Sequence, residues 1–228
     1  MRPASPLTPR FILIVLATIM VSGLLGGCAN MPAFHAGHAA KPEYTPKNFS
    51  GEPVMPSGIH RVLLLPLAGG TVTDPDSVAT FDPILHTALQ RQSRFEVVTL
   101  SREECRNLFH AAEFSSAGAL PNGFMEKLGR LYAVEAIMFV DLTVYRAYRP
   151  LELGFRAKLA TVKDVRLVWS FDETFSASDP TLASSVQRYS TDHGEVDTPT
   201  QLAPKILQSP SRLAAFAADA MFKTLPPR

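Results

Sequence analysis

A charged and then apolar segment at the start of the chain limits which residues can form the folded domain. Arg2 and Arg10 carry positive charge, residues 11–25 are predominantly apolar, and no acidic residue precedes Cys28. This order is typical of a secretory signal, and the apolar stretch is short for a membrane-spanning helix. The sequence therefore predicts that residues 1–27 are a signal peptide and that the domain folds outside the cytoplasm.

The signal ends in Leu25-Gly26-Gly27-Cys28, which resembles the lipobox of bacterial lipoproteins. In that family a peptidase cuts before the cysteine, whose amine and thiol are acylated. The resemblance implies that Cys28 is the lipidation site and that the acyl chains hold the mature protein on a membrane, because each buried methylene contributes about 0.8 kcal/mol. The alternative is an ordinary signal peptide or anchor helix in which Cys28 is incidental, and it predicts the same compartment.

Ala29 follows the cysteine. In lipoproteins of bacteria with two membranes, the absence of aspartate at this position implies sorting to the outer membrane. The resemblance therefore implies the periplasmic face of the outer membrane, and the inner membrane is the alternative.

Charge and cysteine content argue against several classes of function. Without the two arginines of residues 1–27, 20 basic side chains remain against 21 acidic ones. This near-neutral balance does not favour nucleic acid or a polybasic membrane contact. Once Cys28 is lipidated, Cys105 is the one remaining cysteine, so no internal disulfide is expected.

The residues after Cys28 predict a tether followed by one domain. Residues 28–58 contain five prolines and little periodic apolar pattern, which is typical of an extended flexible segment. His35 and His38 lie in it, but two histidines without further ligands do not make a metal site. About 170 residues then remain, which is the size of a single domain.

Periodicity within residues 59–228 predicts a single α/β domain of two or three layers. Two strand–helix units come first, a third helix follows, and three strands then read as an antiparallel meander before a C-terminal helix. An irregular surface segment is expected at 178–210. The predicted strands are 61–67, 95–100, 136–148, 154–162 and 165–177, and the predicted helices start near Asp82, Ser101, Asn122 and Ser211.

Two strands carry further expectations. In the last strand, Leu167 shares its parity with the aromatic side chains at 169, 171 and 175, so these four should face the core while the alternate positions face water. Asp141 lies inside an apolar strand, where an unpaired charge is costly. We expect it to face water or to pair with an arginine such as Arg146 or Arg156.

The succession of elements resembles a superfamily of periplasmic lipoproteins. It includes the curli-secretion lipoprotein, the lipoprotein activators of penicillin-binding proteins and the amino-terminal domain of the Tol-system translocation protein. The similarity rests on the segments 61–67, 89–92, 94–98 and Trp169-Ser170, whereas Asp164-Val165 replaces the Asp and Thr-Gly usual at the turn before that tryptophan. The resemblance implies a small α/β domain and an accessory protein that binds other envelope components.

Motifs for catalysis do not occur in the sequence. It contains no GxSxG elbow, HExxH pair, P-loop, dinucleotide glycine fingerprint or CxxC pair. Gly69 and Gly70 follow a strand and precede a helix, but the loop has no Lys or Arg before Arg91 to bind a phosphate. No catalytic, cofactor-binding or metal-binding residue is predicted, and the chain is not expected to be an enzyme.

The sequence leaves three functions in competition. The favoured one is a non-enzymatic accessory or scaffolding factor for envelope assembly or secretion, which recruits a partner through a sheet edge or residues 178–210. The second is a small-molecule-binding protein or enzyme with a cleft at the strand ends near Gly69, Gly70 and Asp74. The third is a subunit of an oligomeric secretion channel. The envelope partner is not identified, and a homo-oligomer stays open.

Overall fold

The computed structural model describes residues 43–70, 75–192 and 207–228. Structural statements below concern these residues. The predicted signal peptide, Cys28 and the first part of the predicted tether lie outside them.

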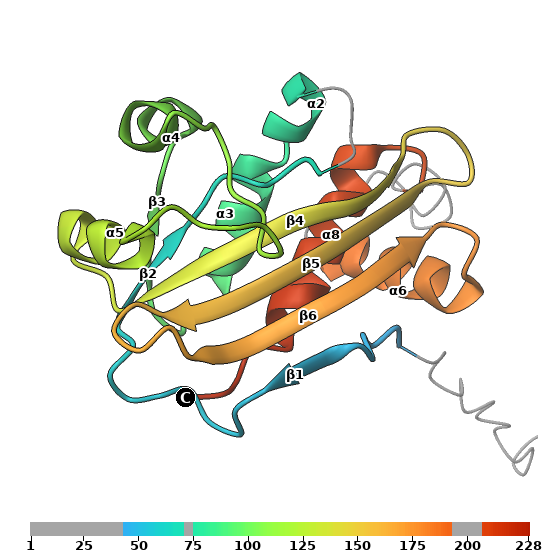
Figure 1. Ribbon diagram of the computed structural model, residues 1–228. Coiled ribbons are helices and arrows are strands. Elements are labelled where there is room, and N and C mark those ends of the chain that lie inside the picture. Colours follow the sequence, from blue (N-terminus) through green and yellow to red (C-terminus); the bar gives the residue numbers. More distant parts are fainter. Residues whose placement is uncertain (1–42, 71–74, 193–206) are drawn as a thin grey trace, which may run out of the picture. The chain divides into compact units, whose positions relative to one another are not determined.

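A six-stranded mixed sheet forms the centre of the described domain (Figure 1). Its order is β1-β6-β5-β4-β2-β3, in which β2, β3 and β4 are parallel and β4, β5, β6 and β1 alternate in direction. The predicted mixed α/β fold with an antiparallel meander is confirmed. The strands are β1 (Phe49–Gly51), β2 (Arg61–Leu64), β3 (Glu96–Thr99), β4 (Ala136–Arg146), β5 (Glu152–Thr161) and β6 (Leu167–Ser176).

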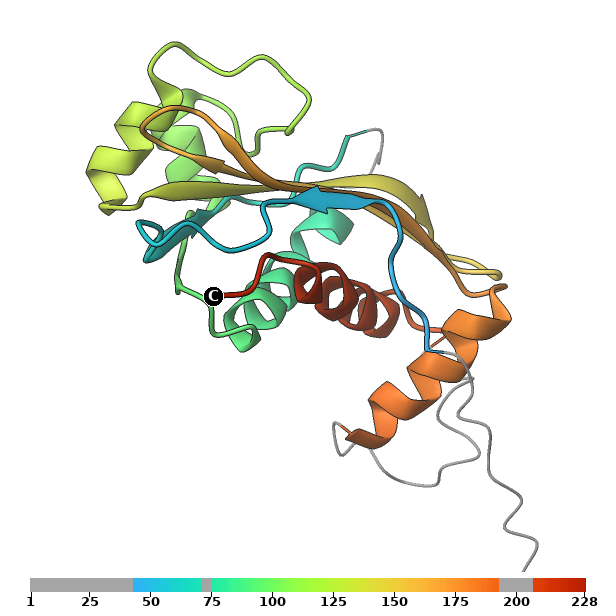
Figure 2. The same cartoon turned by 90° about the horizontal axis from the view of Figure 1, so that it is seen from below.

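Helices lie on both sides of this sheet. α3 and α8 lie against one face, and α5 with the connection that precedes it lies on the other side (Figure 2). Local sequence starts α4 as predicted, because the Ser101 hydroxyl accepts the Glu104 N–H at 3.1 Å and the Glu104 carboxylate accepts the Ser101 N–H at 3.0 Å. The helices are α2 (Pro75–Ala79), α3 (Asp82–Arg91), α4 (Arg102–Phe109), α5 (Phe124–Tyr132), α6 (Pro180–Asp192) and α8 (Pro210–Lys223).

Two apolar clusters divide the core between the faces of the sheet. The larger cluster joins all the long strands to α3, α6 and α8 and includes Trp169, Phe171 and Phe222. The smaller one packs α4 and α5, through Cys105 and Phe124 among others, against β2 and β4. The half of the sheet made by β2, β3 and β4 therefore has three layers, and the half made by β5, β6 and β1 has two. We call these the covered half and the open half.

The predicted tether is wrong over residues 43–58, which bond to the rest of the domain. Residues 49–51 form β1 and pair antiparallel with β6, and the Met55 N–H donates to the Pro227 carbonyl at 2.7 Å. Met55 and Ile59 are both buried. The ordered domain therefore begins before residue 58. The prediction failed because a proline-rich segment can still add a short edge strand to a sheet.

The predicted irregular segment at 178–210 is also wrong over 180–192, which form α6. The Asp179 carboxylate accepts the N–H groups of Thr181 and Leu182 at 2.7 and 3.3 Å, which caps the helix. Leu182 and Val186, four residues apart, are fully buried and attach it to the core. Residues 193–206 lie outside the described residues.

The predicted facing of Leu167 is wrong because β6 contains a β-bulge. Leu159 pairs with Trp169 and Ala160 pairs with Leu167, so Val168 is an extra residue on the β6 side. Val168 and Trp169 are both buried, whereas Leu167 is 49% exposed. The bulge moves Leu167 to the face opposite the larger core cluster, while the aromatic residues that follow point into that cluster as predicted.

Candidate functional site

The strand ends that the sequence offered as a cleft are occupied by a structural ion-pair network. Arg102 on α4 reaches across to Asp82 on α3 at 2.7 Å, also pairs with Glu113, and donates to the Leu67 carbonyl at 2.7 Å. Glu113 in turn accepts the Gly69 N–H at 2.7 Å. Burial lowers the pKa of Arg102, but the hydrogen bonds to Asp82 and Glu113 outweigh it and raise the pKa above its usual value.

Little space remains beside this network. The hollow at the end of β2 measures about 40 Å³, which is too small for a substrate. Gly70 has φ +56° and a Cβ there would lie 3.2 Å from the Leu142 carbonyl oxygen, so this glycine serves a close backbone approach. Asp74 lies outside the described residues. Asp82 begins α3 as predicted, but its carboxylate accepts the Leu67 N–H at 2.9 Å instead of capping its own helix.

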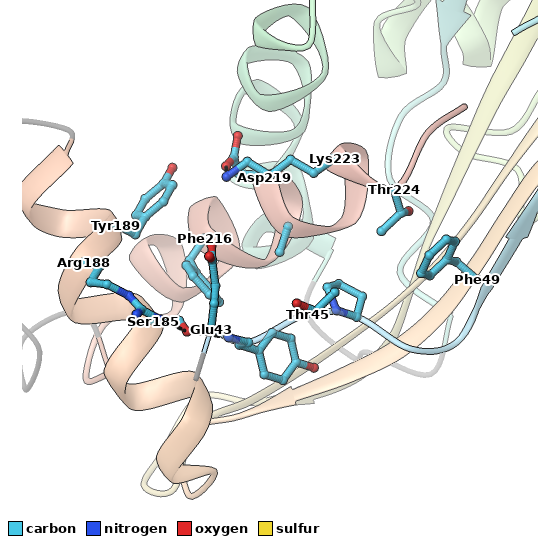
Figure 3. A pocket seen from close by; sticks show the side chains of 13 residues that line it. Glu43, Thr45, Phe49, Ser185, Arg188, Tyr189, Phe216, Asp219, Lys223 and Thr224 are labelled. Atoms are coloured by element: carbon cyan, nitrogen blue, oxygen red, sulfur yellow. Dashed lines mark hydrogen bonds and ion pairs between the residues drawn. The ribbon is translucent and has the colours of Figure 1, made fainter. Parts of the chain in front are cut away.

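A larger hollow lies elsewhere, between residues 43–49, α6 and α8, and has a volume of about 420 Å³ (Figure 3). α6 and α8 supply two of its walls, and residues 43–49 run from beside α6 toward β1 along a third side. This pocket is lined by Glu43, Tyr44, Thr45, Pro46, Phe49, Ser185, Arg188, Tyr189, Phe216, Asp219, Ala220, Lys223 and Thr224.

A buried carboxylate defines the polar end of this pocket. Asp219 is 3% exposed, and its oxygens lie 3.0 Å from the Lys223 ammonium one turn later on α8 and 3.5 Å from the Arg91 guanidinium on α3. Gln92 adds a hydrogen bond of 3.4 Å. Two cations and an amide therefore compensate the buried charge. Figure 3 shows Asp219 and Lys223 side by side on the pocket wall.

Tyr44 fixes the segment that closes the pocket. Its backbone N–H donates to the Ser185 hydroxyl at 2.6 Å, and its phenol donates to the Glu173 carboxylate at 2.8 Å. Burial, the hydrogen bond and the charge of Glu173 together raise the pKa of the Tyr44 phenol well above its usual value. The ring packs 5.5 Å from Phe175 and 6.4 Å from Phe216, measured between centroids.

The pocket is built for contact with an amphipathic group. Aromatic side chains at 44, 49, 189 and 216 supply apolar surface. Charged side chains of both signs also line it, namely Arg188 on α6, Lys223 and Asp219 on α8, and Glu43. The pocket brings together three segments that are distant in the sequence, which is why sequence reasoning missed it. One signal was readable, since Asp219 and Lys223 are spaced for an ion pair on one helix face.

Asp141 differs from both expectations. It is 4% exposed, and its carboxylate accepts the backbone N–H of Ser116 at 2.9 Å and the hydroxyl of the same residue. Arg146 and Arg156 form ion pairs with other carboxylates on the meander strands. The predicted arginine pair and the predicted wet position are therefore wrong: Asp141 fastens the connection between α4 and α5 onto the sheet.

The remaining candidates give no further site. Cys105 is buried and free, and burial raises the pKa of its thiol, which suits a packing role. Within the described ranges, no three His, Cys, Asp or Glu side chains are grouped to hold a metal ion. No helix in the described part of the chain is long and apolar enough to span a membrane. Cys28, His35, His38 and His193 lie outside the described residues.

Comparisons with known proteins give structural likenesses alone. No family model and no curated protein matches the chain. A PelC dodecamer from Paraburkholderia phytofirmans is 13% identical, over 79% of this chain and 96% of that chain, with a TM-score of 0.46. Lipoprotein GNA1162 from Neisseria meningitidis is 14% identical, over 60% and 99%, with a TM-score of 0.42.

The LpoB C-terminal domain from Salmonella enterica is 13% identical, over 51% of this chain and 83% of that chain, with a TM-score of 0.33. TolB from Acinetobacter baumannii is also among the similar structures. Their low identities and TM-scores assign no activity or partner to this chain.

Proposed function

We propose that this chain is a lipid-anchored accessory protein of the cell envelope whose α/β domain binds another envelope protein. One observation carries the proposal: the domain has a closed apolar core, yet Val165 and Leu167 stand 61% and 49% exposed at the rim of a single groove. Adjacent apolar side chains lose contact with water when a partner covers them, which favours binding.

The ionisable side chains support binding over chemistry. Arg102 is used to join α3, α4 and the sheet, and Asp141 holds a surface connection. Asp219, in the pocket between α6 and α8, is compensated by two cations. A catalytic acid or base needs access to a substrate proton, and these three groups are occupied by structural partners.

The proposed anchor places the domain near a membrane. Fourteen residues separate Cys28 from Glu43, where the described domain starts. At full extension they span about 50 Å, so in this proposal the start of the domain lies within that reach of the membrane surface. With Ala29 after the lipobox cysteine, the proposed location is the periplasmic face of the outer membrane.

Mass spectrometry of the membrane-fraction protein tests the anchor directly. The wild type is expected to begin at residue 28 and to carry added acyl mass, and Cys28→Ala is expected to be neither acylated nor cut before residue 28. An unmodified wild type released with the soluble periplasmic proteins would contradict the anchor.

Site-specific photo-crosslinking in cells then tests partner binding, with a photoreactive residue at position 167 and a control at position 148. Tyr148 is 75% exposed on the β4–β5 turn. The proposal predicts a defined adduct with an envelope protein from position 167 and none from position 148. Crosslinking of neither position to a protein would contradict partner binding at this groove, which is the observation that supports the accessory role.

Small-molecule binding is a second candidate, and the 420 Å³ pocket with its buried Asp219 favours it. Native mass spectrometry of the intact protein purified from cells tests this function. A bound small molecule that is lost in Phe216→Ala, and kept in Leu131→Ser on the opposite face, would support it. A spectrum with no ligand in either protein would count against it.

A further inference from the structure

The turn between β5 and β6 places an apolar side chain where the backbone disfavours it. Val165 has φ +53°, in the left-handed region, and its side chain is 61% exposed. Hairpin turns normally place Gly or Asn in this conformation, and a β-branched residue there is an outlier. Neither the backbone nor burial in the core therefore favours valine at this position.

A second local irregularity presents a neighbouring apolar side chain on the same surface. The β-bulge at Val168 turns Leu167 away from the larger core cluster, leaving it 49% exposed. Without the extra residue, Leu167 would share the buried parity of Trp169. Bulges commonly re-aim a side chain at functional positions.

Both side chains line one groove, and we name it the hairpin groove. It has a volume of about 280 Å³ and is bordered by the β5–β6 hairpin, the connection between α4 and α5, and α5 itself. Its lining residues are Ser115, Ser116, Leu120, Met125, Phe139, Lys158, Ala160, Val165 and Leu167.

One wall of the hairpin groove is held rigid by polar contacts. The Lys158 ammonium donates to the Ser116 carbonyl at 2.8 Å, and the buried Asp141 accepts the Ser116 N–H. Lys158 is the single ionisable residue of the lining, so the groove presents an apolar surface with one positive charge. The ammonium has three N–H donors, and the Ser116 carbonyl uses one of them.

We propose that the hairpin groove is the docking site for a partner-protein segment in which an apolar side chain is flanked by Asp or Glu. The proposal rests on the accessory function above and names its contact surface. The apolar side chain contacts Val165 and Leu167, and the carboxylate meets Lys158. Charge complementarity selects this partner, because an acidic group gains a cation in the groove whereas a basic group would meet a like charge.

Selection from a random 12-residue peptide library tests the chemistry of the partner. The full chain is reconstituted in nanodiscs, and empty nanodiscs remove peptides that bind lipid. We expect enriched peptides to carry an apolar residue next to Asp or Glu. We expect their affinity to fall about tenfold for Leu167→Ser and severalfold for Lys158→Gln. Leu131→Ser, at a 57% exposed position on α5, is the control and should bind as the wild type does.

The possible results distinguish a failure of the hairpin-groove proposal from a failure of the proposed accessory function. Peptides that bind the wild type and Leu167→Ser equally would overturn the groove and leave an accessory role elsewhere on the domain. Enriched peptides without acidic residues, or no enrichment at all, would overturn the proposed chemistry. Unchanged circular dichroism and unfolding temperature of Leu167→Ser establish that lost binding is not lost folding.

Two other occupants have distinct signatures, and either would contradict the proposal. A second copy of the chain in the groove predicts an oligomer, seen by sedimentation of the detergent-solubilised protein, that Leu167→Ser dissociates. A lipid surface predicts that vesicles of phosphatidylethanolamine and phosphatidylglycerol compete with the selected peptides.

Discussion

Both halves of the sheet contain ion pairs between arginine and carboxylate side chains, but these pairs differ in their exposure to water. In the covered half, helices lie on both faces, and Arg102 is 15% exposed where it pairs with Asp82 and Glu113. In the open half, one face lacks a helical layer, and the Arg156–Asp172 pair is 38% and 43% exposed. The first half is packed for stability, whereas the second keeps a surface that folding does not require.

The largest contrast is expected from removing apolar side chains. The Phe124 ring packs 4.6 Å from Phe109 and 4.7 Å from Phe114 in the covered half. Phe124→Ala should lower the free energy of unfolding by about 3–5 kcal/mol, because it opens a cavity. Leu167→Ala, in the open half, should change it by no more than about 0.5 kcal/mol. Urea denaturation measures both, and similar losses would remove the distinction between the halves.

Ion pairs should show the same contrast on a smaller scale. Arg102→Met removes the cation shared by the Asp82 and Glu113 carboxylates and one donor to the Leu67 carbonyl. It should cost about 2–3 kcal/mol because the site is partly shielded from water. Arg156→Met breaks a solvent-exposed pair and should cost less than about 1 kcal/mol. Urea denaturation of the two variants at one ionic strength measures both losses of unfolding free energy. A larger loss of unfolding free energy for Arg156→Met than for Arg102→Met would contradict the distinction between the covered half and the open half.

A pH-dependent effect is expected at the start of α4. Hydrogen bonds from the Ser101 hydroxyl and N–H lower the pKa of Glu104. A lowered folded-state pKa means that this stabilisation is present above the unfolded-state pKa, near 4.3, and is lost as pH falls through the folded value. Glu104→Gln should therefore unfold at a slightly lower temperature than the wild type at pH 7.

That difference should shrink as the pH falls from 5 to 3, followed by differential scanning fluorimetry. Glu126→Gln is the control, because its pair with Arg130 on α5 is more than 70% exposed. It should show little change over the same range. A constant difference for Glu104→Gln across this range would contradict the linkage to Glu104 ionisation.

Local signals predicted most elements of the fold. Ser101 and Glu104 located α4, and the apolar run at 61–67 located β2. α6 was missed although Asp179-Pro180 is a helix start and Leu182 and Val186 have helical spacing. Polar residues dominate that segment, and this composition led to the prediction of an irregular segment although the local pattern indicated a helix.

The surfaces required information that no local pattern contains. The facing of Leu167 depends on a bulge that is set by pairing with β5, and the partner of Asp141 lies 25 residues away. The pocket between α6 and α8 needs residue 44 beside residues 185 and 216. Val165 could be located at a turn, but the sign of its φ depends on the hairpin geometry.

The most direct test of the central claim is one variant, Val165→Asn, measured for stability and for binding of the selected peptides. Asparagine tolerates the left-handed conformation, so the unfolding temperature should rise by about 2–4 °C, which corresponds to about 1 kcal/mol. Peptide affinity should fall at the same time, because the apolar side chain is gone. A variant that is less stable and binds as well as the wild type would show that Val165 serves the fold, and would contradict the account.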